Sequence, residues 1–202
     1  IFDAARKNFR NDIYPDYKAH RPPAPEDLVP QFPLMREAAE AFGLPIMEME
    51  GFEADDIIAT YARLAKAEGT QVTIVSSDKD LMQLVRDGIQ LMDPMKNIMI
   101  GPDEVFAKFG VTPDKVVDVQ ALCGDTSDNV PGVAGIGVKT AAELITTYGS
   151  LENLLDNLAS IKQPKRRETL ETHAELARIS KKLVTLCDSV PVPVPVQQLV
   201  TG

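Results

Sequence analysis

The sequence contains no tryptophan, only two cysteines and two histidines, and no long apolar run. Cys123 and Cys187 stand far apart and belong to no Cys-x-x-Cys motif, which argues against a disulfide framework and against a zinc site. We interpret both as reduced thiols of the core. No segment reaches the roughly 18 apolar residues of a membrane span, and residues 1–7 do not resemble a signal peptide. We therefore expect a cytoplasmic protein without a membrane partner.

The chain is short of positive charge for a nucleic-acid binder, because its formal net charge is −9. Affinity for phosphates normally comes from Lys and Arg side chains. The positive charges are nevertheless concentrated at residues 6–21 and 162–182. They form either binding surfaces or solvated helix faces, and the second is the more frequent case for any single residue. Two bound divalent cations would offset about four of the negative charges.

Apolar periodicity predicts the fold class. With 202 residues, 44% of them hydrophobic, the chain can bury one large core. Strands are predicted by short apolar runs at residues 1–3, 46–49, 71–76 and 89–92. Helices are predicted between them at 33–42 and 53–68. This alternation indicates an α/β fold with a mostly parallel central sheet flanked by helices.

Beyond residue 101 the pattern is helical. Pro102 and Pro113 each suit a first helical turn, Gly149 separates two helices, and residues 167–186 carry apolar side chains at helical spacing. Valine and proline alternate over residues 190–196, which predicts an extended segment. We therefore expect an α/β core at 1–101, a helical region at 102–189 and a proline-rich linker at 190–202.

Acidic side chains are concentrated in three short motifs. They are Glu53-Ala54-Asp55-Asp56, Ser77-Asp78-Lys79-Asp80 and Gly124-Asp125-Thr126-Ser127-Asp128-Asn129. Each motif alone has a structural interpretation, as acids of a first helical turn, as an N-cap or as an Asx-rich turn. However, Glu53 and Asp56 share a face of their predicted helix, and Asp3 and Asp78 stand at the carboxyl ends of predicted strands, where open parallel sheets bind ligands. Converging carboxylates need cations between them, and oxygen ligands suit Mg²⁺ or Mn²⁺.

A glycine-rich loop follows the last acidic motif. Gly132 and Gly137 have the separation of a P-loop, but Val138 intervenes before Lys139-Thr140, and no strand precedes the loop. Gly135-x-Gly137 also lacks the third glycine of a dinucleotide fingerprint. A better interpretation is a turn between two short helices, where glycines allow the backbone close to a phosphate. The sequence therefore favours a sequence-independent clamp on duplex nucleic acid.

These motifs together resemble a known family. They are Phe2-Asp3-Ala4, Phe9-Arg10, Tyr17-Lys18-Ala19-His20-Arg21, Gly51-Phe52-Glu53-Ala54-Asp55-Asp56, Ser76-Ser77-Asp78-Lys79-Asp80-Leu81, Gly124-Asp125-Thr126-Ser127-Asp128-Asn129-Val130-Pro131-Gly132-Val133 and Gly135-Ile136-Gly137-Val138-Lys139-Thr140-Ala141. The set closely resembles the 5′-to-3′ exonuclease domain of bacterial DNA polymerase I, a member of the flap endonuclease family. The resemblance covers most of the chain.

The resemblance implies roles for individual residues. By position, the acids that bind two Mg²⁺ ions, which Mn²⁺ can replace, are Asp3, Glu53, Asp55, Asp56, Asp78, Asp80, Asp125 and Asp128. Arg10 and Lys18 match basic residues that contact the scissile phosphate, and Arg21 lies near them. The DNA-binding residues are Arg21, Gly132, Gly135, Gly137, Lys139 and Thr140, most of them in a helix-three-turn-helix motif near residues 121–148. The resemblance also implies a monovalent cation at the glycine loop.

The resemblance further implies the surroundings of the chain. The family has another strand and helix, with a metal-binding acid, ahead of the segment that begins here, so we expect an N-terminally truncated fragment. We also expect covalently linked polymerase domains in the parent protein and a place in the bacterial cytoplasm, at the nucleoid.

The resulting hypothesis is a structure-specific 5′ nuclease that uses two metals to hydrolyse phosphodiesters of 5′ flaps, nicked duplex DNA and RNA primers during replication and repair. Two alternatives remain. A non-catalytic duplex DNA-binding module would keep the glycine loop but would not need the acids, so metal-dependent cleavage separates it. A metal-dependent ribonuclease would keep the acids without the duplex clamp, so preference for branched DNA over single-stranded RNA separates that one.

Overall fold

A computed structural model of the chain describes residues 1–200. The strands are β1 (Val72–Val75), β2 (Ile89–Asp93) and β3 (Ile98–Ile100). The helices of the first half are α1 (Arg10–Ile13), α2 (Gln31–Ala41) and α3 (Ala54–Ala67), with a 3₁₀ helix η1 at Lys79–Leu84. The second half contains α4 (Pro102–Phe109), η2 (Pro113–Lys115), α5 (Val116–Cys123), α6 (Val138–Tyr148), α7 (Leu151–Asp156), η3 (Leu158–Ser160), α8 (Pro164–Thr172), α9 (Ala174–Val184) and η4 (Val196–Gln198).

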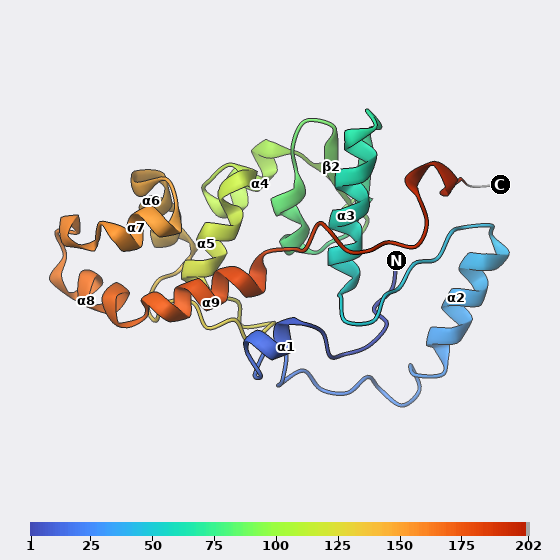
Figure 1. Cartoon of the computed structure of the whole chain (residues 1–202), viewed down its shortest axis with the longest axis horizontal. Coiled ribbons are helices and arrows are strands. Elements are labelled where there is room, and N and C mark those ends of the chain that lie inside the picture. Colours follow the sequence, from blue (N-terminus) through green and yellow to red (C-terminus); the bar gives the residue numbers. More distant parts are fainter. Residues whose placement is uncertain (201–202) are drawn as a thin grey trace.

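The prediction of an α/β fold with helices beside a sheet is confirmed, but the sheet is small and mixed. Its order is β1-β2-β3, with β1 and β2 parallel and β2 and β3 antiparallel. The antiparallel pair arises because residues 94–97 form a tight turn, in which Asn97 adopts a positive φ of 53°. The expected sheet was mostly parallel because β3, which makes it mixed, was not among the predicted strands. Figure 1 shows the small sheet and α3 at the centre, the bundle α5–α9 on one side, and α2 apart on the other.

Two predicted strands are absent from the described part of the chain. Residues 1–3 and 46–49 are not assigned as strands, although the amide of Phe2 donates a hydrogen bond to the carbonyl of Met47 at 2.9 Å. A single hydrogen bond between two extended segments does not make a ladder. These segments therefore run beside each other without joining the sheet.

The first acidic motif lies at the start of helix α3, where one of its acids caps the helix. Asp56 in its first turn accepts a hydrogen bond from the backbone amide of Glu53 at 3.0 Å, as in a capping box. Ile57 and Tyr61 lie on its buried face, and Gly69 with φ +80° follows its end. The Asp56 carboxylate thus holds the start of the helix in place, and this fixes the positions of the neighbouring carboxylates.

One hydrophobic core connects the two halves that the sequence suggested as separate regions. The same cluster of buried residues includes Ile74 and Leu91 of the sheet, Val119 of α5, Leu144 of α6 and Leu170 of α8. The acidic motifs on either side of residue 101 are therefore fixed relative to each other by shared packing.

The C-terminal helices differ from the prediction of one helical run over residues 167–186. The chain breaks at His173, which separates α8 from α9. Helix α9 packs against α5 and α1. None of the helices within residues 1–200 is long and apolar enough to cross a membrane.

The valine-proline tail is extended over most of its length but is not a detached linker. Val190 is buried, and its amide donates to the hydroxyl of Thr60 at 3.1 Å. Tyr61 donates from its hydroxyl to the carbonyl of Val194 at 2.9 Å. The tail therefore lies along α3, and the last two residues of the predicted linker, 201–202, fall outside the described residues.

Candidate metal centre and nucleic-acid interface

The acids predicted from three distant motifs meet in one place. A small cavity is lined by Glu53 and Asp55 at the start of α3, by Asp80 in η1, and by Asp125 and Asp128 in the loop after α5. The fold brings them together because α3 and α5 both pack against η1. Asp3 and Asp78 do not line this cavity, although Asp3 Oδ1 accepts a hydrogen bond from the amide of Ala54 at 2.7 Å. The cavity therefore collects five of the eight predicted metal residues.

Asp56 and Arg10 form an internal ion pair. The Arg10 Nη1 and Nη2 atoms lie 2.8 and 2.7 Å from the two carboxylate oxygens of Asp56, and the residues are 1% and 0% exposed. Arg10 Nε also donates to the carbonyl of Leu183 at 2.7 Å, and the amide of Cys187 donates to Asp56 at 2.8 Å. The Asp56 oxygens and the Arg10 donors are thus used within the protein, and the predicted roles of Asp56 at a metal and of Arg10 at a phosphate stay predictions. Arg10 nevertheless lines the cavity, whereas Asp56 does not.

Lys18 and Tyr17 connect the first and third acidic motifs. Lys18 Nζ lies 2.5 Å from Glu53 Oε1 and 3.4 Å from Asp128 Oδ2. The Tyr17 hydroxyl donates to Glu53 at 3.1 Å, and Arg21 forms an ion pair with Asp128. Lys18 has a positive φ of 55°, and its amide donates to the carbonyl of Asp128 at 2.9 Å. Backbone and side chain together hold Lys18 beside the acids, and its contact with a scissile phosphate stays a prediction.

The second acidic motif has structural roles as well. Asp78 Oδ1 caps η1 by accepting from the amide of Asp80 at 2.9 Å, so the N-cap interpretation is confirmed. Asp80 in turn accepts from the Gln120 side chain at 2.6 Å. Lys79 Nζ lies 2.6 Å from Asp125 Oδ2. A carboxylate has two oxygens, so a cap or an ion pair leaves acceptor capacity in each of these groups.

The Asx-turn interpretation of the third motif is also confirmed. Asp125 Oδ1 accepts from the amide of Ser127 at 2.7 Å. The two ends of this loop are joined by reciprocal backbone hydrogen bonds between Asp125 and Val130, at 3.0 and 2.7 Å. The turn orients Asp125 and Asp128 toward the same cavity.

The electrostatics of the cavity show an excess of negative charge. Burial, followed by the nearby Asp78 and Glu53 carboxylates, raises the pKa of Asp55 to about 7. Burial and Asp78 likewise raise the pKa of Asp80 to about 6. Burial would raise the pKa of Asp125, but the contact with Lys79 and the backbone hydrogen bonds from Ser127 and Asp128 together outweigh it, so this pKa is lowered. Asp55 and Asp80 are thus the two carboxyl groups without sufficient positive charge near them.

The residues of this cavity fit a hard divalent cation. Their donors are oxygens only, and a cation between Asp55 and Asp80 would relieve the repulsion that raises their pKa values. Within residues 1–200, however, no three acidic, histidine or cysteine side chains already converge in a geometry that could hold a metal ion. The positive groups that form ion pairs with the carboxylates of the cavity are Arg10, Lys18, Arg21 and Lys79.

The glycine loop divides into a structural and an exposed part. Gly132 is buried, and a Cβ there would lie 2.4 Å from the amide nitrogen of Gly124, so its predicted contact with DNA is not available. Gly135 and Gly137 are exposed, and a Cβ at either would meet nothing within 4 Å. Lys139, in the first turn of α6, is exposed as well. The exposed part carries the candidate duplex interface.

Sequence reasoning missed three residues of the centre. Tyr17 and Lys79 lie within recognised motifs. Each follows an acidic residue in the sequence, and this was the signal that could have identified them. Gln120 lies within the apolar helix α5, and its approach to Asp80 has no signal in local spacing.

Comparisons with known proteins cover the whole chain. Residues 1–110 match the family model of the 5′-3′ exonuclease N-terminal, resolvase-like domain, and residues 111–202 match that of the 5′-3′ exonuclease C-terminal SAM fold. Over 200 residues the chain is 55% identical to DNA polymerase I of Rhizobium leguminosarum, covering 99% of this chain and 20% of that protein. It is 42% identical to a 5′-3′ exonuclease of Aquifex aeolicus over 92% of this chain and 63% of the relative. The chain thus spans about a fifth of the length of that polymerase.

Solved structures of 5′ nucleases have the same fold as this chain. The crystal structure of the T5 D15 protein co-crystallised with metal ions has a TM-score of 0.81 and 26% identity, covering 92% of this chain and 74% of that one. A variant of the T5 D15 flap endonuclease in a pseudo-enzyme-product complex with DNA and metal ions has a TM-score of 0.80 and 25% identity, covering 92% and 72%.

Proposed function

Because the chain belongs to the 5′-3′ exonuclease family, we propose that it forms the core of a structure-specific 5′ nuclease. Its substrates would be phosphodiesters of 5′ flaps, nicked duplex DNA and primer-bearing duplexes. The observation that carries this proposal is the convergence of Glu53, Asp55, Asp80, Asp125 and Asp128 in one cavity from segments far apart in sequence.

The acids would hold two divalent cations, Mg²⁺ in the cell, with Mn²⁺ as a substitute. Of the eight acids predicted as ligands, the cavity favours those five, and Asp3 and Asp78 stand at positions from which they would act through water. Bound cations supply an activated water and stabilisation of the departing oxygen. Solved relatives that contain metal ions support this assignment.

The basic side chains would act in two different ways. Lys18 is held at the cavity by Glu53 and Asp128, and burial is outweighed by Glu53, so its pKa is raised and the ammonium stays charged. It would stabilise the negative charge that develops on the phosphoryl oxygens. Arg10 would act as a positioning residue instead, because it fixes Asp56 and with it the start of α3.

The duplex would contact the exposed loop before α6, where Gly135, Gly137, Lys139 and Thr140 stand at or near the helix start. Arg21 would add a contact near the cavity. Helix α5, this loop and α6 would form a helix-three-turn-helix over residues 121–148. The glycine loop of this motif would hold a monovalent cation. We further propose linked polymerase domains and a place at the bacterial nucleoid. Relatives such as DNA polymerase I, of which the chain spans only a part, support the first of these.

The experiment is a cleavage assay with Mg²⁺ on a 5′-flap duplex, a nicked duplex and single-stranded RNA, with a metal-free control. Release of short 5′-phosphorylated products from the flap and the nicked duplex, but not from the single-stranded RNA, supports the proposal. Duplex binding without cleavage, in a chain extended to the length of the solved relatives, would instead identify a non-catalytic binding module. Preferential hydrolysis of the RNA would identify a ribonuclease.

A further inference from the structure

The carboxylates of the acidic cavity are not equally free to bind a cation. Within residues 1–200, no hydrogen bond or ion pair reaches the side chain of Asp55, and Asp80 accepts only one, from Gln120 at 2.6 Å. By contrast, Asp125 and Asp128 each contact at least one positive side chain. The cavity therefore has a free half, formed by Asp55 and Asp80, and a paired half, formed by Asp125 and Asp128.

Lys79 holds the paired half by direct contact. Its Nζ lies 2.6 Å from Asp125 Oδ2, and the other oxygen of that carboxylate accepts from the amide of Ser127 at 2.7 Å. Both oxygens are thus engaged, in a side chain that is only 5% exposed. Burial opposes the charge of Lys79, but the contact with Asp125 and the nearby Asp80 and Asp128 carboxylates together outweigh it, so the pKa of Lys79 is raised.

The charge of Lys79 opposes a divalent cation at Asp125. Two positive groups on one carboxylate repel each other, and the repulsion is strong where most water is excluded. The ammonium stands at the end of a flexible four-carbon stem, and the Lys79 side chain is 37% exposed, so it can withdraw into solvent. A cation that binds Asp125 therefore has to displace Lys79.

We propose that Lys79 is a tethered cation of the metal centre. Its ammonium occupies Asp125 while a single divalent cation is held at the free half. A second cation enters the paired half only when the ammonium leaves, so Lys79 sets the metal concentration at which the second position fills. The inference rests on the proposed function, because it concerns the metal centre assigned there.

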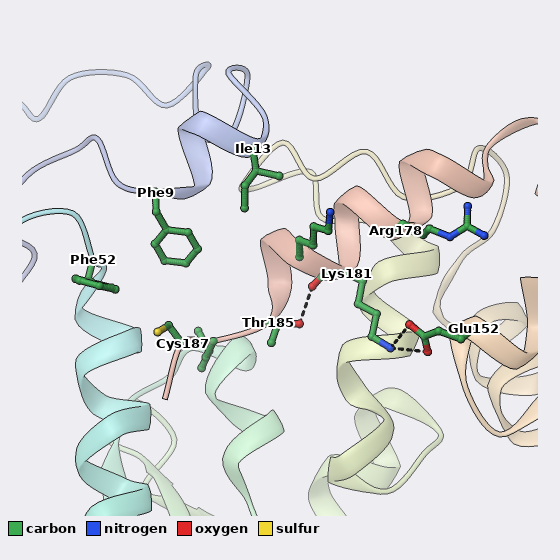
Figure 2. A pocket seen from close by; sticks show the side chains of 10 residues that line it. Phe9, Ile13, Phe52, Glu152, Arg178, Lys181, Thr185 and Cys187 are labelled. Atoms are coloured by element: carbon green, nitrogen blue, oxygen red, sulfur yellow. Dashed lines mark hydrogen bonds and ion pairs between the residues drawn. The ribbon is translucent and has the colours of Figure 1, made fainter. Parts of the chain in front are cut away.

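The alternative is an ordinary structural ion pair, and the chain contains one for comparison. Lys181 of α9 lies 2.7 Å from Asp118 and 2.7 Å from Glu152, and Figure 2 shows its contact with Glu152 in the groove beside α9. The side chains of Lys181 and Asp118 are 29% and 9% exposed, close to the 37% and 5% of Lys79 and Asp125. Neither partner of Lys181 lines the acidic cavity. Lys181→Met is therefore the matched control for Lys79→Met.

The test counts bound Mn²⁺ from the electron paramagnetic resonance signal of the free ion, in wild type and in both variants. Methionine keeps most of the apolar body of the lysine stem and removes its charge. Wild type should bind one Mn²⁺ tightly and a second more weakly. Lys79→Met should tighten the weaker position about tenfold, through the loss of one repelling charge. Lys181→Met should leave both positions as in wild type.

A second measurement uses wild type alone and so does not depend on the folding of a variant. An amine-acylating reagent is applied with and without saturating Mn²⁺, and the modified lysines are identified by mass spectrometry. Release from Asp125 frees the Lys79 nitrogen, so its modification should rise severalfold when the metal is bound. Lys181 should react equally in the two conditions.

Three results would overturn the proposal. The first is equal or weaker Mn²⁺ binding by Lys79→Met, or no second bound ion in either wild type or this variant. The second is unchanged modification of Lys79 in the saturated protein, which would leave an ordinary ion pair. The third is a similar tightening in Lys181→Met, because the effect would then come from net charge and not from the contact with Asp125.

These measurements also separate the inference from the proposed function. If flap DNA is never cleaved but Lys79→Met binds the second Mn²⁺ more tightly, the nuclease proposal fails and the tethered cation stands. If flap DNA is cleaved while metal binding and modification show no role for Lys79, only this inference fails.

Discussion

Arg10 and Asp56 are joined by two hydrogen bonds of 2.8 and 2.7 Å, and both residues are almost completely shielded from solvent. The pair ties α1 to the start of α3, where Glu53 and Asp55 stand. The arrangement of the acidic cavity therefore depends on an ion pair that has no free atoms for substrate.

Removing one partner of this pair should destabilise the fold. Arg10→Ala leaves the Asp56 carboxylate buried without its cation, which should lower the free energy of unfolding by about 3–5 kcal/mol. Arg10→Lys should not restore it, because an ammonium cannot make the two-pronged contact. Urea denaturation measures both variants, with Arg21→Ala at a half-exposed ion pair as the control. A loss below about 1 kcal/mol for Arg10→Ala would show that the pair does not support the fold.

Lys18 should affect metal binding and chemistry in opposite directions. Its ammonium occupies Glu53 and Asp128, so Lys18→Met should leave Mg²⁺ affinity equal or higher. The same change should lower the rate of the chemical step by about 10²–10³, because a charge facing the transition state is lost. Calorimetric titration of Mg²⁺ and single-turnover cleavage give the two values. Weaker metal binding together with an unchanged rate would contradict the assigned role.

Asp55 and Asp80 should make the stability of the metal-free protein depend on pH. Their folded pKa values of about 7 and about 6 lie above the ordinary value of 3.8, so the folded state holds protons that the unfolded state has released. Stability should therefore rise as the pH falls from about 8 to 5, by roughly 1–2 kcal/mol after allowance for solvent. Thermal melts in EDTA measure the trend, and Asp55→Asn should flatten it. A melting temperature that falls steadily as the pH is lowered from 8 to 5 would refute the assignment.

Mg²⁺ should compete with these same protons. Asp55 has to be deprotonated to bind a metal, so affinity should be about tenfold weaker at pH 6 than at pH 8. Calorimetry in two buffers of different ionisation enthalpy would count the released protons. Equal affinities at the two pH values would place the metal away from Asp55.

Two glycines of the same loop should respond in opposite ways to alanine. Gly132 has φ +60° and would place a Cβ 2.4 Å from a backbone atom, so Gly132→Ala should cost at least about 1–3 kcal/mol of stability. Gly137 has φ −91° and open space around it, so Gly137→Ala should leave the melting temperature unchanged. Its effect should appear only as weaker binding of nicked duplex, since the added methyl meets the DNA backbone. Unaltered affinity would mean that the loop does not approach a phosphate.

The sequence by itself determined the acidic motifs, the helix that carries the first of them, and the family resemblance. It could do so because these features are local: helix α3 follows from apolar spacing and from Gly69, and caps or turns use residues two or three positions apart, as Asp78 and Asp125 do. Strands β1 and β2 were also predicted, since each is a short apolar run.

Only the tertiary structure decided which acids face the cavity and which are used internally. Asp55 and Asp56 are neighbours in an acidic motif, yet Asp55 lines the cavity while Asp56 is enclosed with Arg10. The difference depends on Arg10 of α1 and on Cys187, in the segment after α9, which reach Asp56 from positions some 45 and 130 residues away in the sequence. Local spacing contains no information on such contacts, because they are fixed by the shared core rather than by any single element.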